Sequence, residues 1–200
     1  MNTNPRERSS LTEAVARVFG WLRNASKRID KEYVMLPVAG SDPQYRERVY
    51  CYELYHHLRT RWDRRFPFSL CGEIDKRNHA HIRGKYLTNI KPDFLVHRLG
   101  WMDSTSNLLA LEVKAANAKD TYLRTDLRKL TALRRKLTNA EHEPANYHHA
   151  ILWIYGLPLE YWPDVRSKIF SKSTRDIKTS LIRCFLHEKA GKEATEVFWE

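Results

Sequence analysis

The feature of the sequence that most constrains the fold is a nearly continuous apolar run, LLALEVKA, at residues 108–115. A run of this kind is typical of a central strand that is buried on both faces. Because strand side chains alternate between faces, Glu112 and Lys114 project side by side, in line with Leu108 and Ala110. Burying two charges is costly unless they are paired or hold a metal ion. The run therefore predicts a functional site at Glu112 and Lys114.

A second acid is expected close to this strand. Asp93 follows Pro92 and opens a short apolar segment at 94–96, and proline is tolerated at the start of a strand. If the turn-rich segment 101–107 joins the two strands as neighbours, Asp93 reaches the Glu112 side of the sheet. Two carboxylates and an ammonium group would then converge. Carboxylate oxygens suit Mg²⁺, and we expect Mn²⁺ to substitute for it.

The remaining elements follow from local patterns. A capping box at Ser10 and Glu13 with apolar residues at helical spacing predicts a helix to about residue 27. Asp42 as cap and Pro43 in the first turn predict a second helix to about residue 61. Leucines at spacings of four and three predict a helix over 121–137, and another is expected at 161–170. Strands are expected at 68–74 and 150–155, a loop or hairpin at 78–89, and a closing hairpin at 181–187 and 196–199. This order predicts an α/β fold with a mixed central β-sheet flanked by α-helices.

The charge balance favours a polyanionic partner. Lys and Arg number 35 and Asp and Glu 24, which gives a formal net charge of 35 − 24 = +11. A basic excess of this size favours nucleic acid through phosphate contacts and counterion release. Three widely spaced cysteines argue against a disulfide framework. No segment has the length of a membrane span and the polar N-terminus does not read as a signal peptide, so we expect a cytoplasmic protein with no membrane partner.

Pro92-Asp93 followed nineteen residues later by Glu112-Val113-Lys114 resembles the PD-(D/E)xK nuclease superfamily, whose Asp starts one strand and whose ExK lies on the next. The resemblance implies a restriction-endonuclease-like fold and hydrolysis of phosphodiester bonds that leaves a 5′-phosphate. It implies Asp93, Glu112 and the Val113 carbonyl as Mg²⁺ ligands, with Lys114 as a catalytic residue.

Many members of the superfamily have a further acid on a helix before the sheet. Glu53 fits that place, and Glu73 on the first expected strand is its competitor. The resemblance covers roughly residues 45–155. We therefore expect one nuclease-like domain over 1–200, with a helical extension at 1–40, a catalytic core at about 45–155 and a C-terminal addition at 160–200.

The helix expected at 121–137 offers a surface for the phosphate backbone. Arg124, Arg128 and Arg135 lie within about 40° of one another at 100° per residue, well away from the leucines. Lys129 belongs to a second basic line. Phosphate binding is one interpretation of these side chains, and an ordinary solvated helix face is the other.

The sequence therefore predicts a Mg²⁺-dependent deoxyribonuclease whose catalytic residues are Asp93, Glu112, Lys114 and Glu53. Restriction-type phage defence, repair and a mobile element are the settings expected for it. One domain supplies one site, so cutting both strands of a duplex needs a homodimer, a partner subunit or two encounters. Two alternatives stay open: a non-catalytic DNA-binding module, and a subunit of a larger nucleic-acid-processing complex.

Overall fold

A computed structural model of the chain describes residues 5–72, 86–87, 90–101, 105–134 and 145–200, with only the backbone described at 5–9. Its helices are α1 (Pro5–Ser26), α2 (Lys31–Val34), α3 (Glu47–Arg61), α4 (Asp120–Arg134) and α5 (Trp162–Phe170), with 3-10 turns η1 (Leu159–Tyr161) and η2 (Thr179–Leu181). Its strands are β1 (Leu36–Val38), β2 (Ser41–Gln44), β3 (Ser69–Gly72), β4 (Phe94–His97), β5 (Asn107–Ala115), β6 (His149–Tyr155), β7 (Ile182–His187) and β8 (Thr195–Val197).

Six of these strands form one mixed sheet in the order β3-β4-β5-β6-β7-β8. The pairs β3–β4, β4–β5 and β7–β8 are antiparallel, whereas β5–β6 and β6–β7 are parallel. The two parallel connections pass through α4 and α5, as parallel pairing requires a crossover. A mixed α/β sheet flanked by helices is therefore confirmed, and β5 is the central buried strand that the apolar run predicted.

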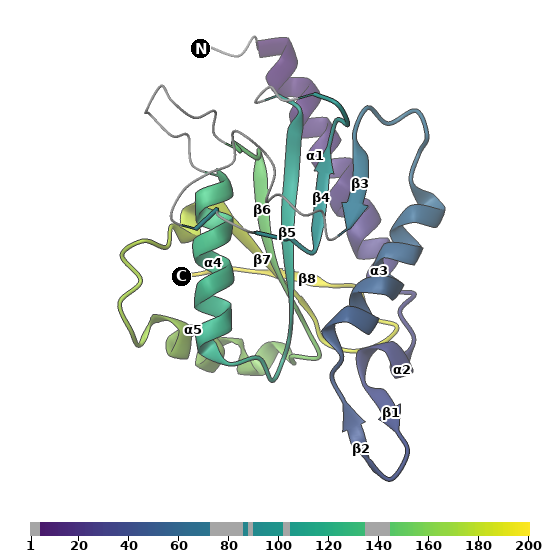
Figure 1. Ribbon diagram of the computed structural model, residues 1–200, viewed down its shortest axis with the longest axis vertical. Helices are drawn as coiled ribbons and strands as arrows, with labels where there is room; N and C mark the ends of the chain where they lie inside the picture. Colours follow the sequence, from purple (N-terminus) through teal and green to yellow (C-terminus); the bar gives the residue numbers. More distant parts are fainter. Residues whose placement is uncertain (1–4, 73–85, 88–89, 102–104, 135–144) are drawn as a thin grey trace.

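Helices cover both faces of the sheet (Figure 1). On one face α1 and α3 pack against β5 and its neighbours, and residues such as Val18 and Leu54 join Leu111 and Val113 in one core cluster. On the other face the leucines of α4 pack with α5 and with Ala110 of β5 in a second cluster. From Ala110 onward the even-numbered positions of β5 thus lie on the α4 side, which decides where Glu112 and Lys114 can reach; Leu108, beside the irregular pairing with β4, belongs to the first cluster.

The expected helix start at Asp42 and Pro43 is wrong. Both residues lie in the exposed strand β2, which pairs with β1 in a small hairpin, and α3 begins only at Glu47. Gly40 has a φ of 75° in the turn, a conformation that glycine adopts without steric cost. Proline is tolerated in such an edge strand. The segment therefore pairs with β1, although its local pattern resembles a helix cap.

The N- and C-terminal segments are built into the same domain. Buried side chains of α1 belong to the core cluster that contains β5, and β7 and β8 extend the six-stranded sheet. The closing hairpin expected near the C-terminus is confirmed, with Phe185 opposite Glu196. We expected an N-terminal extension at 1–40 and a C-terminal addition at 160–200. Both segments contribute to the sheet and core that residues 45–155 begin.

A hydrogen-bonded network is buried between α3 and the sheet. The indole N–H of Trp153 donates to the hydroxyl of Tyr50 over 2.8 Å, and that hydroxyl lies 2.8 Å from Nδ1 of His187. All three residues are fully buried. Burial lowers the pKa of His187 to about 4. The ring is therefore neutral near pH 7, and its tautomer sets whether Nδ1 accepts from the Tyr50 hydroxyl or donates to it.

Within the described residues, none of the helices combines the length and the apolar character that crossing a membrane requires.

Candidate active site

Asp93 and Glu112 meet at one end of the sheet. Phe94 stands opposite Leu111 in the antiparallel β4–β5 register, so Asp93 comes alongside Glu112. Oδ2 of Asp93 accepts a 2.7 Å hydrogen bond from the backbone N–H of Val113, and the Asp93 and Glu112 carboxyl groups are close enough to interact electrostatically. The structure thus brings together the two acids that the sequence predicted to converge.

The two carboxyl groups lie in an environment that resists negative charge. Glu112 is 3 % exposed, and burial together with the charges of Asp126 and Asp93 raises its pKa well above the usual range. Burial likewise raises the pKa of Asp93. Among the described residues, no donor lies within hydrogen-bond distance of Oε1 of Glu112. A buried carboxylate of this kind is stabilised by a proton or by a cation.

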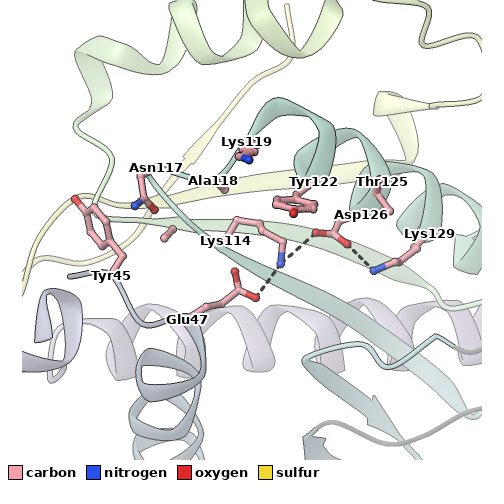
Figure 2. Close-up of a pocket in the computed structure, with 11 residues that line it drawn as sticks. Tyr45, Glu47, Lys114, Asn117, Ala118, Lys119, Tyr122, Thr125, Asp126 and Lys129 are labelled. Carbon is pink, nitrogen blue, oxygen red and sulfur yellow. Dashed lines mark hydrogen bonds and ion pairs between the residues drawn. The ribbon is translucent and has the colours of Figure 1, made fainter.

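Lys114 projects from the same face of β5 and ends among oxygen atoms. Its Nζ donates to the Val113 carbonyl over 2.7 Å and to Oε1 of Glu47 over 2.9 Å, and it lies 3.2 Å from Oδ2 of Asp126 (Figure 2). Burial by itself would lower the pKa of Lys114, but the negative charges of Asp126 and Glu47 raise it. Lys114 is therefore an ammonium ion at neutral pH.

Asp126 and Lys129 of α4 complete the cluster. The sequence did not point to Asp126, and it suggested Lys129 only as a residue that contacts phosphates. Asp126 is 3 % exposed, and its Oδ1 lies 2.7 Å from Nζ of Lys129 while its Oδ2 faces Lys114 (Figure 2). Nζ of Lys129 is also 4.0 Å from Oε1 of Glu112. A signal was present: Asp126 interrupts the apolar stripe of Leu123, Leu127 and Leu130, where a charged residue needs a partner.

The acid that α3 contributes to the cluster is Glu47. Two residues that are six positions apart on an α-helix point in directions about 120° apart and lie about 9 Å apart along the axis. Glu47 and Glu53 therefore cannot face the same point. The carboxylate of Glu53 lies 3.0 Å from Nε2 of His57 on its own helix. The expected placement of Glu53 beside the site is thus corrected to Glu47. Its competitor, Glu73, lies outside the described residues.

The arginines expected to contact phosphates are placed differently. Arg124 is 5 % exposed and donates to the carbonyls of Lys168 and Ile169 at the end of α5. Arg128 pairs with Asp176 over 3.0 Å. Both side chains contact either α5 or the segment that follows it. This side of α4 therefore packs against the protein itself. The interpretation of Arg124 as a phosphate contact is therefore corrected, and Arg135 lies outside the described residues.

A metal ion at this site would depend on few side chains. No set of three or more His, Cys, Asp and Glu side chains among the described residues is arranged to hold a metal ion. Two carboxylates, Asp93 and Glu112, are adjacent, and the Val113 carbonyl that completes the expected ligand set accepts a bond from Lys114. Oε1 of Glu112 accepts no hydrogen bond among the described residues and faces Lys129 Nζ at 4.0 Å, an environment that fits a cation held by these groups and by water.

A pocket of about 550 Å³ opens beside the cluster. It is lined by Tyr45, Glu47, Lys114, Ala115, Asn117, Ala118, Lys119, Tyr122, Thr125, Asp126 and Lys129 (Figure 2). Lys114, Asp126 and Lys129 belong both to the cluster and to the pocket wall. A molecule in the pocket would therefore lie next to the buried acids.

Comparison with known proteins adds no assignment to this geometry: no protein-family model matches the chain, and neither a curated protein nor a solved structure is significantly similar to it.

Proposed function

We propose that the protein is a Mg²⁺-dependent nuclease that hydrolyses phosphodiester bonds in DNA, with a restriction-endonuclease-like arrangement of its sheet. The observation that carries this proposal is the convergence of Asp93, Glu112 and Lys114 at one end of β4 and β5. A structural ion pair alone would not need two buried carboxyl groups in contact, because their mutual repulsion is destabilising. The formal net charge of +11 supports a polyanionic substrate.

Each residue has a role in the proposed reaction. Asp93, Glu112 and the Val113 carbonyl would hold Mg²⁺, which when bound neutralises phosphate charge and lowers the pKa of water. The Lys114 ammonium orients the attacking water and stabilises the charge that develops on the phosphate oxygens. The water oxygen bonds to phosphorus as the bond to the 3′ oxygen breaks. The products are a 5′-phosphate and a 3′-hydroxyl, whose oxygen takes up a proton.

Glu47 and Asp126 act as positioning residues in this proposal. Each holds a carboxylate oxygen within 3.2 Å of Lys114 Nζ, and Asp126 also holds Lys129. Lys129 would contact the phosphate, a role that its position on the pocket wall and 4.0 Å from Glu112 supports. A single site per chain cuts one strand, so a double-strand break would require a homodimer, a partner subunit or two encounters.

The test is cleavage of labelled linear and circular DNA with Mg²⁺, Mn²⁺ or EDTA. Asp93→Ala and Lys114→Ala are compared with wild type, and Lys172→Ala on the surface after α5 is the matched control. We expect cutting that requires the metal, is lost in the first two variants and is retained in the control. Wild-type protein that binds DNA but never cuts it with either metal would overturn the proposal and favour a non-catalytic binding module.

A further inference from the structure

The pocket beside the active site has charged residues that are largely buried on its inner side and exposed polar and aromatic residues at its rim. The inner side holds the paired charges of Lys114, Asp126 and Lys129, whereas Asn117, Lys119 and Tyr122 at the rim are exposed to solvent. Tyr122 is 57 % exposed, so its ring face is open to solvent at the edge of the pocket. Figure 2 shows the Tyr122 ring beside Asp126, at the side of the pocket.

The size of the pocket limits what can enter it. A volume of about 550 Å³ falls within the roughly 300–1,000 Å³ typical of small-ligand sites. A base that is stacked and paired inside a duplex cannot enter such a pocket unless it first leaves the stack, which costs a few kcal/mol. A nucleotide that is already unpaired enters without this cost. A pocket of this size that took up a base would therefore favour unpaired over paired nucleotides.

The chemistry of the wall matches a nucleotide. An exposed tyrosine offers a face on which any base can stack, and sequence-tolerant recognition of single strands relies on such stacking. The Asn117 amide can both donate and accept hydrogen bonds at a base edge. Three lysines against two acids leave the lining with a net positive charge, which suits a phosphate.

We propose that this pocket binds one unpaired nucleotide next to the scissile phosphate, with its base on Tyr122 and its phosphate near Lys119 and Lys129. The substrate class is then a nucleic acid with an unpaired segment: a single strand, an unpaired end or a flap. The assignment rests on the proposed nuclease function for the position of the scissile phosphate, but binding in the pocket requires no cutting.

The test is equilibrium binding in EDTA at fixed salt, so that no hydrolysis occurs. One fluorescent sequence is presented as single-stranded DNA, single-stranded RNA, blunt duplex and duplex with an unpaired flap. We expect single strands and the flap to bind at least tenfold more tightly than the blunt duplex. The two single strands identify which nucleic acid the pocket prefers.

Variants assign the effect to the tyrosine. Tyr122→Ala should lose about tenfold of the single-strand affinity, since stacking of one base on an aromatic residue is worth roughly five- to 160-fold. Tyr122→Phe should retain the affinity because it keeps the ring. Tyr52→Ala, which removes a tyrosine that is 61 % exposed on α3, is the matched control and should bind as wild type does.

The two proposals fail in different ways. Equal binding of blunt duplex and single strand, or unchanged binding by Tyr122→Ala, overturns the pocket assignment even if the protein cuts DNA. Preferential binding of single strands that depends on Tyr122, without cutting in Mg²⁺ or Mn²⁺, supports the pocket and overturns the nuclease function instead.

Discussion

The Asp93 carboxylate is fixed by the backbone of the neighbouring strand, because its Oδ2 accepts a 2.7 Å hydrogen bond from the N–H of Val113. This bond links the aspartate of the expected motif to Val113, the middle residue of its Glu-x-Lys part. It also holds the Asp93 carboxylate near Glu112, where the charge of Asp93 contributes to raising the pKa of Glu112. The position of Asp93 is therefore determined by β4–β5 pairing and not by a flexible loop.

The acid pair predicts stabilisation by divalent cations. Wild-type protein should show a higher melting temperature in Mg²⁺ or Mn²⁺ than in EDTA, because a ligand at 100 times its Kd adds about 2.7 kcal/mol to the free energy of unfolding. Asp93→Asn and Glu112→Gln should lose this shift, since each removes a charged ligand. Differential scanning calorimetry measures it without reference to activity. An equal shift in wild type and in both variants would place the cation elsewhere, and Glu53→Gln serves as the control.

The position of Glu47 predicts which acid of α3 supports the reaction. Glu47→Gln should lower the single-turnover rate of DNA cutting by about tenfold, because Lys114 loses a carboxylate at 2.9 Å that holds its ammonium group in place. The alkaline limb of the rate profile should also move to lower pH, since the charge of Glu47 raises the pKa of Lys114. Glu53→Gln should cut as wild type does. A larger loss in Glu53→Gln than in Glu47→Gln would contradict this placement.

We expect a substitution of Asp126 to slow DNA cutting more than a substitution of Glu47 does, because Asp126 contacts two lysines. Asp126→Asn should lower the cutting rate by more than Glu47→Gln does, since both Lys114 and Lys129 lose a charged partner. Asp164→Asn, at an exposed acid of α5, is the matched control. Rates are compared under single-turnover conditions at saturating protein. Wild-type rates in Asp126→Asn would show that the lysines do not depend on this carboxylate.

Arg124 is expected to affect stability and not DNA binding. Arg124→Ala should lower the free energy of unfolding by about 2 kcal/mol, because a buried guanidinium donates to two carbonyls at the end of α5. Urea denaturation gives this value, and the exposed Arg175→Ala should change it little. DNA affinity of the folded variant should match that of wild type. A large loss of affinity with unchanged stability would restore Arg124 as a phosphate contact.

His187 predicts acid sensitivity of the fold. Burial lowers its pKa to about 4, so between about pH 6.5 and pH 4 the unfolded chain binds more protons than the folded protein does. Stability should therefore fall as pH falls through this window, by up to about 3 kcal/mol from His187. His149, whose pKa is also lowered to about 4, acts in the same direction. Urea denaturation from pH 7 to pH 4 should show a shallower pH dependence for His187→Gln, and an unchanged slope would contradict the assignment.

Part of the candidate site could be predicted because its residues lie close together on regular strands. The period of two along β5 put Glu112 and Lys114 on one face, and the short connection after β4 made antiparallel pairing with β5 the expected arrangement. The same reasoning failed at Asp42, where pairing between β1 and β2 decided the structure and the local capping pattern did not.

The sequence by itself determined the mixed α/β fold, the central strand at 108–115 and the convergence of Asp93 with Glu112, because these depend on patterns within a strand and on neighbouring strands. Only the tertiary structure decided which helical residues reach them. Glu47 and Asp126 come from α3 and α4, and the orientation of a helix about its axis depends on packing against the sheet. The same packing buried Arg124 under α5, since side-chain direction follows from the contacts that a helix makes on every side.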